Sequence, residues 1–92
     1  MIGRLRGELV GQAEDGTLTL DVGGVGYEVT VPLGTGPRLE RQSDGSVTMW
    51  THAHWPREGE PQLFGFATLA DREAFRLVLR VETVGPKIGL AI

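Results

Sequence analysis

The chain has 92 residues, 40% hydrophobic and 23% charged, a balance typical of one small folded domain rather than a disordered segment. It has no cysteine, which excludes a disulfide framework, a thiolate nucleophile and a cysteine-ligated metal. The net charge of −3 argues against a surface that is basic all over, and no apolar run approaches the roughly 18 residues that span a bilayer. We therefore expect a cytoplasmic protein without a membrane contact, in which any contact with nucleic acid is local.

The first third of the chain alternates with the period of β-strands. "IGRLRGELV" at residues 2–10 is compatible with a first strand, and "TLTLDV" at 17–22 places its apolar side chains on one face. "VGYEVTV" at 25–31 continues the alternation after Gly23-Gly24, a connection that suits a primed turn with positive φ. These residues predict a strand followed by a β-hairpin.

A second hairpin is predicted after a polar connection. Residues 34–46 are rich in turn formers, apart from a short helical turn around Leu39. "SVTMWTHAHW" and "QLFGFA" then read as two strands, and "WPREGEP" between them reads as the hairpin tip. The chain is therefore predicted to be mainly β, with five antiparallel strands in residues 1–66.

Beyond Phe66 the pattern becomes helical. Thr68 followed by Asp71 fits a capping box, and the apolar positions over residues 69–81 predict a helix that ends near Glu82 or Thr83. "TVGPK" then supplies a turn and a proline suited to the start of another helix, in which the sequence ends. A last helix of about six residues is not stable alone, so we expect residues 67–92 to be an incomplete helical domain of a longer protein.

The arginines of the predicted helix share one face. Arg72, Arg76 and Arg80 recur every four residues, which aligns them along its polar side. They could bind phosphate, but a solvated face eased by Glu73 is the favoured interpretation because charge runs usually face water.

The other candidate sites carry weaker signals. His52 and His54 lie on one face of a strand but lack a third ligand, so structural roles are favoured over a metal site. Glu58 and Glu60 occupy a wet turn, and composition alone favours a solubilising role there over acid–base catalysis. The turn at 83–87 could present backbone N–H groups to a phosphate, although an ordinary helix connection explains it equally well. The sequence predicts no catalytic residue, no metal and no cofactor.

The short motifs together resemble a known family. "MIGRLRGELV", "VGGVGYEV", "TH" at 51–52, "RE" at 57–58, "FGF" at 64–66 and "VGPKIGLAI" match, in order and spacing, the N-terminal part of the RuvA family of Holliday-junction-binding proteins. The resemblance covers essentially all 92 residues. It implies an oligonucleotide/oligosaccharide-binding (OB) fold, a five-stranded barrel, over residues 1–66. Residues 67–92 would hold a helix and the start of a helix-hairpin-helix motif.

The resemblance also implies a function and its residues. Family members bind four-way DNA junctions without reading sequence, as part of branch migration in recombination, DNA repair and the SOS response to DNA damage. An acidic pin projects toward the junction centre, and it corresponds here to Glu58 and Glu60, which Gly59 separates where the family usually has adjacent acids. The DNA phosphate-binding turn corresponds to Thr83, Val84, Gly85, Pro86 and Lys87, with Thr83 where glycine is usual. Further candidates to face DNA are Arg57, Arg72, Arg76 and Arg80.

Partners and alternatives complete the predictions. The resemblance implies a homotetramer, a RuvB-type hexameric ATPase that binds a C-terminal domain absent from this sequence, and a junction resolvase as a further candidate partner. The chain itself would be no enzyme, because ATP hydrolysis would belong to that ATPase. Two alternatives remain: a generic OB-fold binder of single strands that uses Trp50, Trp55 and Phe64, and a protein-interaction domain that uses the apolar helix 69–81.

Overall fold

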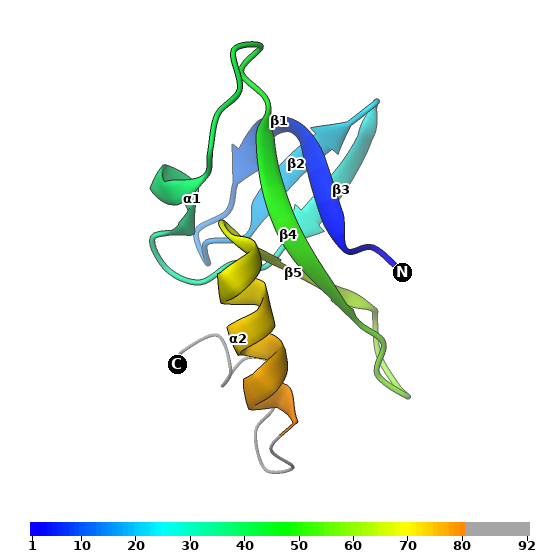
Figure 1. Cartoon of the computed structure of the whole chain (residues 1–92). Helices are drawn as coiled ribbons and strands as arrows, with labels where there is room; N and C mark the ends of the chain where they lie inside the picture. Colours follow the sequence, from blue (N-terminus) through cyan, green and yellow to red (C-terminus); the bar gives the residue numbers. More distant parts are fainter. Residues whose placement is uncertain (81–92) are drawn as a thin grey trace.

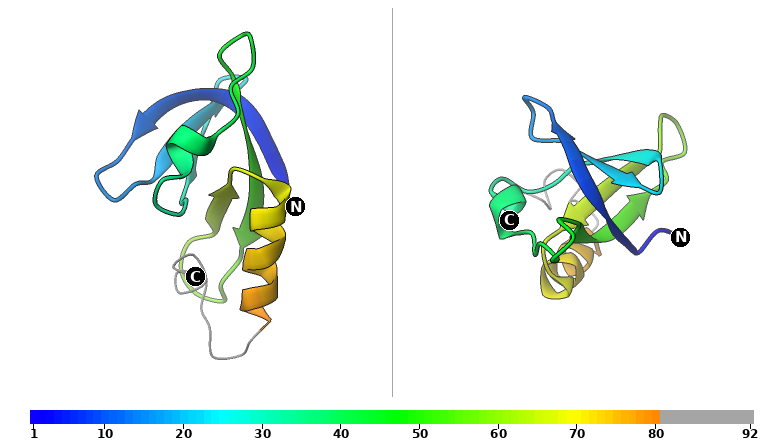
Figure 2. Two further views of the ribbon diagram at one scale, coloured as in Figure 1. Left: turned by 60° about the vertical axis from the view of Figure 1, so that its left-hand side comes forward. Right: turned by 90° about the horizontal axis from the view of Figure 1, so that it is seen from above.

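The computed structural model describes residues 1–80 and consists of one curled sheet with two helices (Figure 1). In chain order its elements are β1 (Arg4–Gln12), β2 (Leu18–Val22), β3 (Val25–Val29), α1 (Thr35–Arg38), β4 (Val47–His54), β5 (Gln62–Phe66) and α2 (Leu69–Leu79). The strands form one antiparallel sheet in the order β3-β2-β1-β4-β5. This confirms the prediction of a mainly β chain with five antiparallel strands. The sheet curls into a half-barrel consistent with an OB-fold (Figure 2).

Strand β1 joins the two hairpins of the sheet. Its residues 4–7 pair with β4, whereas residues 8–12 pair with β2. Gly7 lies where the pairing changes partner, and a Cβ there would collide with the backbone carbonyl of Asp21. A glycine is therefore required for β2 to approach β1 this closely.

The two edge strands of the sheet, β3 and β5, are joined by backbone hydrogen bonds at the end of β3. Thr30, just after β3, donates its N–H to the Leu63 carbonyl at 2.9 Å, and Gly65 donates its N–H to the Thr30 carbonyl at 2.9 Å. This parallel bridge draws β3 against β5. It also brings Gly65 against the core side chains of Val29 and Met49.

The alternating residues form the main core, as the sequence pattern predicts. Its fully buried members are Leu18, Leu20, Val29, Val47 and Met49. The predicted primed turn is confirmed by φ values of 61° at Gly23 and 92° at Gly24. The predicted helical turn near Leu39 is α1, and the buried Leu39 is its C-cap.

Helix α2 covers the face of β4 and β5 that points away from the main core. Phe75 lies with its ring centroid 5.5 Å from that of Phe64 and 4.9 Å from that of Phe66. The predicted cap is confirmed, because the Thr68 hydroxyl accepts the Asp71 N–H at 3.1 Å. The helix ends at Leu79 with Arg80 as its C-cap, earlier than the predicted end near Glu82 or Thr83. The Arg80 N–H bonds back to the Leu77 carbonyl at 3.2 Å, the tighter pattern typical of a last turn.

The predicted second helix and the start of a helix-hairpin-helix lie outside the described residues. The proposed division of the chain near residue 66 stays a prediction. In the described part of the chain, neither helix is long and apolar enough to cross a membrane.

Candidate functional site

The connection between β4 and β5, residues 55–61, projects beyond the end of the half-barrel, and we call it the pin hairpin (Figure 1). Arg57, Glu58 and Glu60 are all exposed on it. Both carboxylates therefore lie in solvent at the tip of a stalk, which is the placement that an acidic pin requires. Their action on DNA stays a prediction.

Gly59 has a conformational reason to separate the two acids. Its φ is 95°, in the left-handed region that favours glycine, while a Cβ at this position would meet no atom within 4 Å. The obstacle to a second adjacent acid is thus the backbone conformation and not lack of space. The turn at Gly59 therefore accounts for the departure of this chain from the usual pin pattern of adjacent acids.

The pin hairpin also adjoins a shallow polar hollow between β3 and β5. Glu28, Thr30, Glu60 and Gln62 contribute to its lining. The carboxylate of Glu28 adds to those of the tip, so negative charge is concentrated at this end of the half-barrel.

The three aromatic side chains named for single-strand binding differ sharply in accessibility. Phe64 is fully buried under α2. Trp50 is partly buried, and the guanidinium carbons of Arg4 and Arg72 each lie 5.4 Å from its ring centroid. Only Trp55, with 62% of its surface exposed, is free to stack on another molecule.

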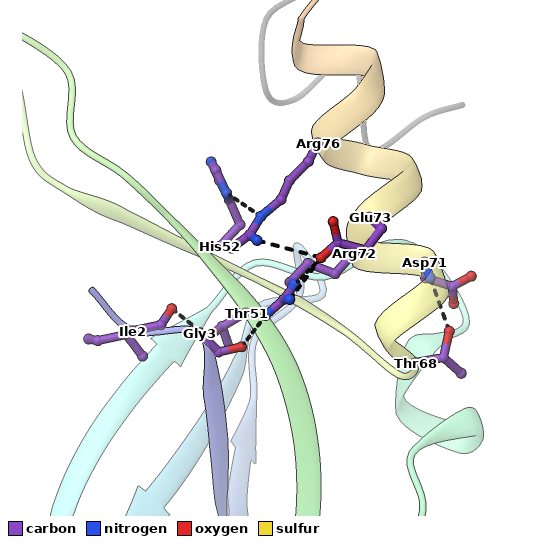
Figure 3. A network of polar contacts seen from close by, with 9 residues as sticks. All are labelled: Ile2, Gly3, Thr51, His52, Thr68, Asp71, Arg72, Glu73 and Arg76. Atoms are coloured by element: carbon purple, nitrogen blue, oxygen red, sulfur yellow. Dashed lines mark hydrogen bonds and ion pairs between the residues drawn. The ribbon is translucent and has the colours of Figure 1, made fainter.

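Arg72 fastens α2 to the N-terminal segment (Figure 3). Its Nη1 donates to the Gly3 carbonyl at 2.7 Å, an oxygen that also accepts the Thr51 N–H at 3.0 Å. Its Nη2 pairs with the Glu73 carboxylate at 2.8 Å, and the Arg72 side chain is only 13% exposed. The interpretation of a solvated arginine face is therefore wrong for Arg72, although Glu73 does offset the charge.

Arg76 contacts the half-barrel through a histidine (Figure 3). Its Nε donates to His52 Nδ1 at 3.2 Å, and its Nη1 lies 3.5 Å from the Glu73 carboxylate. Since Nδ1 accepts, the ring of His52 is neutral with its proton on Nε2. Burial chiefly, and then the positive charge of Arg76, lower the pKa of His52 below its usual 6.5.

These contacts support the structural interpretation of His52. Its ring meets Phe75 edge-on at 5.7 Å, so it belongs to the packing between α2 and β4. Within residues 1–80, no group of three histidine or carboxylate side chains gathers to hold a metal ion.

The remaining predicted site residues divide into two groups. Arg57 and Arg80 are exposed, so they are available for contact with a ligand. The phosphate-binding turn, residues 83–87, lies outside the described residues. For all four arginines, contact with DNA stays a prediction.

The contacts at Gly3 and Thr51 were not predicted from the sequence. The Thr51 hydroxyl donates to the Ile2 carbonyl at 2.8 Å, a bond between residues 49 apart, and Arg72 and Gly3 are 69 apart. Local patterns cannot reveal such pairs, because no periodicity or spacing rule connects them.

Comparison with known proteins places this geometry in a family. The family model described as RuvA N terminal domain matches residues 1–65. Proteins named Holliday junction branch migration complex subunit RuvA align with all 92 residues, at 46% identity in Alkalilimnicola ehrlichii, 49% in Thioalkalivibrio sulfidiphilus and 48% in Pseudomonas aeruginosa. The chain spans 43% to 44% of the length of these relatives. With its half-barrel, its projecting acidic hairpin and this similarity over its whole length, the chain belongs to the RuvA family.

Proposed function

We propose that this chain binds four-way DNA junctions, by their structure and without reading sequence, as part of a branch-migration complex in recombination and DNA repair. The observation that carries the proposal is the exposed pair of carboxylates, Glu58 and Glu60, on a hairpin that projects from a half-barrel of this family. The relatives' shared name, Holliday junction branch migration complex subunit RuvA, supports it.

The pin hairpin acts through repulsion. A carboxylate held against a continuous duplex lies near phosphates of the same sign, and this opposes binding. At the centre of an open junction the strands diverge, so the same carboxylates occupy a space that the backbones leave. Negative charge at the tip therefore selects for the junction instead of increasing affinity for DNA in general.

Affinity itself must come from positive groups and backbone N–H donors. Arg57 and Arg80 are exposed, and residues 83–87 would add backbone donors beside Lys87. Arg72 and Arg76 would act mainly by holding α2 in place, since their guanidinium groups already bond within the chain. Phosphate contacts release counterions, so binding should weaken steeply with salt and be insensitive to base sequence.

The wider assembly follows from the same proposal. Four copies of the chain would lay an open junction across one face, and a hexameric ATPase of the RuvB type would pump the arms in the cytoplasm. The chain would hydrolyse no ATP itself, and the contact with the ATPase would be made by sequence beyond these 92 residues. A junction resolvase would be a further partner on the bound DNA.

The experiment compares binding to an immobile four-way junction and to a linear duplex of the same sequence, at two salt concentrations. The unmodified chain should prefer the junction, and its affinity should fall at the higher salt. Equal affinity for the two DNAs would contradict the proposal.

The pin is tested by the double variant Glu58→Gln with Glu60→Gln. It should raise affinity for duplex more than affinity for the junction and so reduce the preference. Glu14→Gln with Glu40→Gln is the matched control, since both residues are exposed, lie outside the pin hairpin and change the net charge equally. If both double variants shift the preference alike, total charge and not the pin is responsible.

The protein-interaction alternative retains one supporting observation. Leu69 and Leu77 of α2 are exposed apolar side chains in the described part of the chain. Oligomers that form as the protein concentration rises, in a protein that does not bind DNA, would favour this function over junction binding.

A further inference from the structure

We propose that Trp55 is a stacking platform for a nucleobase that is unpaired at the centre of the junction. The inference deepens the proposed function and rests on it. It assigns a second, attractive role to the pin hairpin beside the repulsion by Glu58 and Glu60.

The first ground is the unusual freedom of the Trp55 ring. Trp55 is 62% exposed, whereas the Trp50 ring is contacted by two guanidinium groups and Phe64 is fully buried. Within residues 1–80, the Trp55 side chain takes part in no aromatic pair, cation–π contact or hydrogen bond. The free energy falls when a flat partner covers the face of a large apolar ring that is exposed to water.

The second ground is position. Trp55 follows His54, the last residue of β4, and so stands at the root of the pin hairpin, where the chain leaves the half-barrel (Figure 1). Pro56 comes next and restricts the backbone of Trp55 to extended conformations. The ring is therefore carried on a strand end with limited backbone freedom, which lowers the entropy lost when a base stacks on it.

The third ground is electrostatic. Glu58 and Glu60, beside Trp55 on the same hairpin, repel phosphates, so a strand that reaches this point is driven to keep its backbone away. The face of a base carries no net charge and escapes this repulsion. A neutral aromatic ring on the same hairpin as two carboxylates thus offers the base a contact that does not require a phosphate to approach them, although Arg57 on this hairpin offsets part of their charge.

The fourth ground is the chemistry of strand exchange. Branch migration must break base pairs before it forms new ones, and each broken pair loses stacking. Stacking on an indole offsets part of that loss, and it is tolerant of sequence because every base has a π face. Recognition of this kind agrees with binding that does not read sequence.

The test compares Trp55→Leu and Trp55→Phe with the unmodified chain on the immobile junction and on linear duplex. Loss of stacking in Trp55→Leu should weaken junction binding roughly five- to a hundred-fold, the range expected for one stacked base. Trp55→Phe keeps an aromatic face and should retain most of the affinity, and duplex affinity should be equal in all three proteins. Leucine and phenylalanine variants that bind the junction equally well would overturn the inference.

A second measurement reports stacking directly. A junction with 2-aminopurine at the crossover should fluoresce less when bound by the unmodified chain than when bound by Trp55→Leu, because stacking on an indole quenches an unpaired base. Equal fluorescence of the two bound junctions would overturn the inference while leaving the proposed function intact. An unmodified chain without junction preference would instead remove the proposed function, and the role of Trp55 with it.

Discussion

Gly65 is predicted to be irreplaceable at the closure of the half-barrel. In Gly65→Ala the new Cβ would lie 2.5 Å from Val29 Cγ1 and 3.1 Å from Met49 Sδ, and both of these residues are fully buried. Forcing a methyl group into such a core costs about 1–3 kcal/mol. Moving β5 away to make room would weaken the two hydrogen bonds of 2.9 Å at Thr30, each with a net value of about 1 kcal/mol. We therefore expect a loss of about 2–4 kcal/mol in the free energy of unfolding.

The assay is urea unfolding of Gly65→Ala beside the matched variant Gly26→Ala. Gly26 is also in a strand, but the nearest atom to its added Cβ is Thr19 Cγ2 at 3.7 Å, an ordinary contact. Its substitution should change stability by less than about 1 kcal/mol. For a chain of this size the loss in Gly65→Ala corresponds to a fall in Tm of roughly 8–30 °C. Equal stability of the two variants would refute the argument that β5 closes against β3 without spare volume.

Two further predictions concern the attachment of α2. Arg72→Met removes the bond to the Gly3 carbonyl and should lower the free energy of unfolding by about 1–2 kcal/mol, whereas Arg80→Met at an exposed position should change it by less than about 0.5 kcal/mol. Equal urea midpoints for these two variants would count against a structural role for Arg72. The pKa of His52 is lowered in the folded chain, so the unfolded chain binds a proton more readily. The stability that His52 contributes above pH 6.5 should therefore be lost as the pH falls from 6.5 through the pKa of the folded chain. Urea midpoints at pH 7.5 and 5.5 should show this loss in the unmodified chain and less of it in His52→Gln; an identical loss in both would assign it to other groups.

The sequence predicted the features that neighbouring residues determine. Gly23-Gly24 between two alternating runs identified a primed hairpin, and Thr68 with Asp71 identified the start of α2, because these signals act over a few residues. The exposed tip with Glu58 and Glu60 followed in the same way from its turn-forming residues.

What the sequence could not predict depends on contacts between distant segments. The spacing of Arg72 and Arg76 is typical of a solvated helix face, yet both side chains bond to the half-barrel through Gly3 and His52. The need for glycine at position 65 is likewise invisible in the sequence, since it arises only when β3 and β5 meet. Tertiary contacts, and not local propensity, decide these positions.

The pairing of β1 has a consequence for synthesis on the ribosome. Residues 8–12 find their partner in β2 soon after both emerge, whereas residues 4–7 must wait for β4, which is made much later. During that interval the nascent chain exposes an unpaired strand edge, the kind of surface on which chains aggregate. Arg4 and Arg6 are exposed on this segment, and their charges discourage its pairing with another chain. The two arginines would thus protect the protein before its fold is complete.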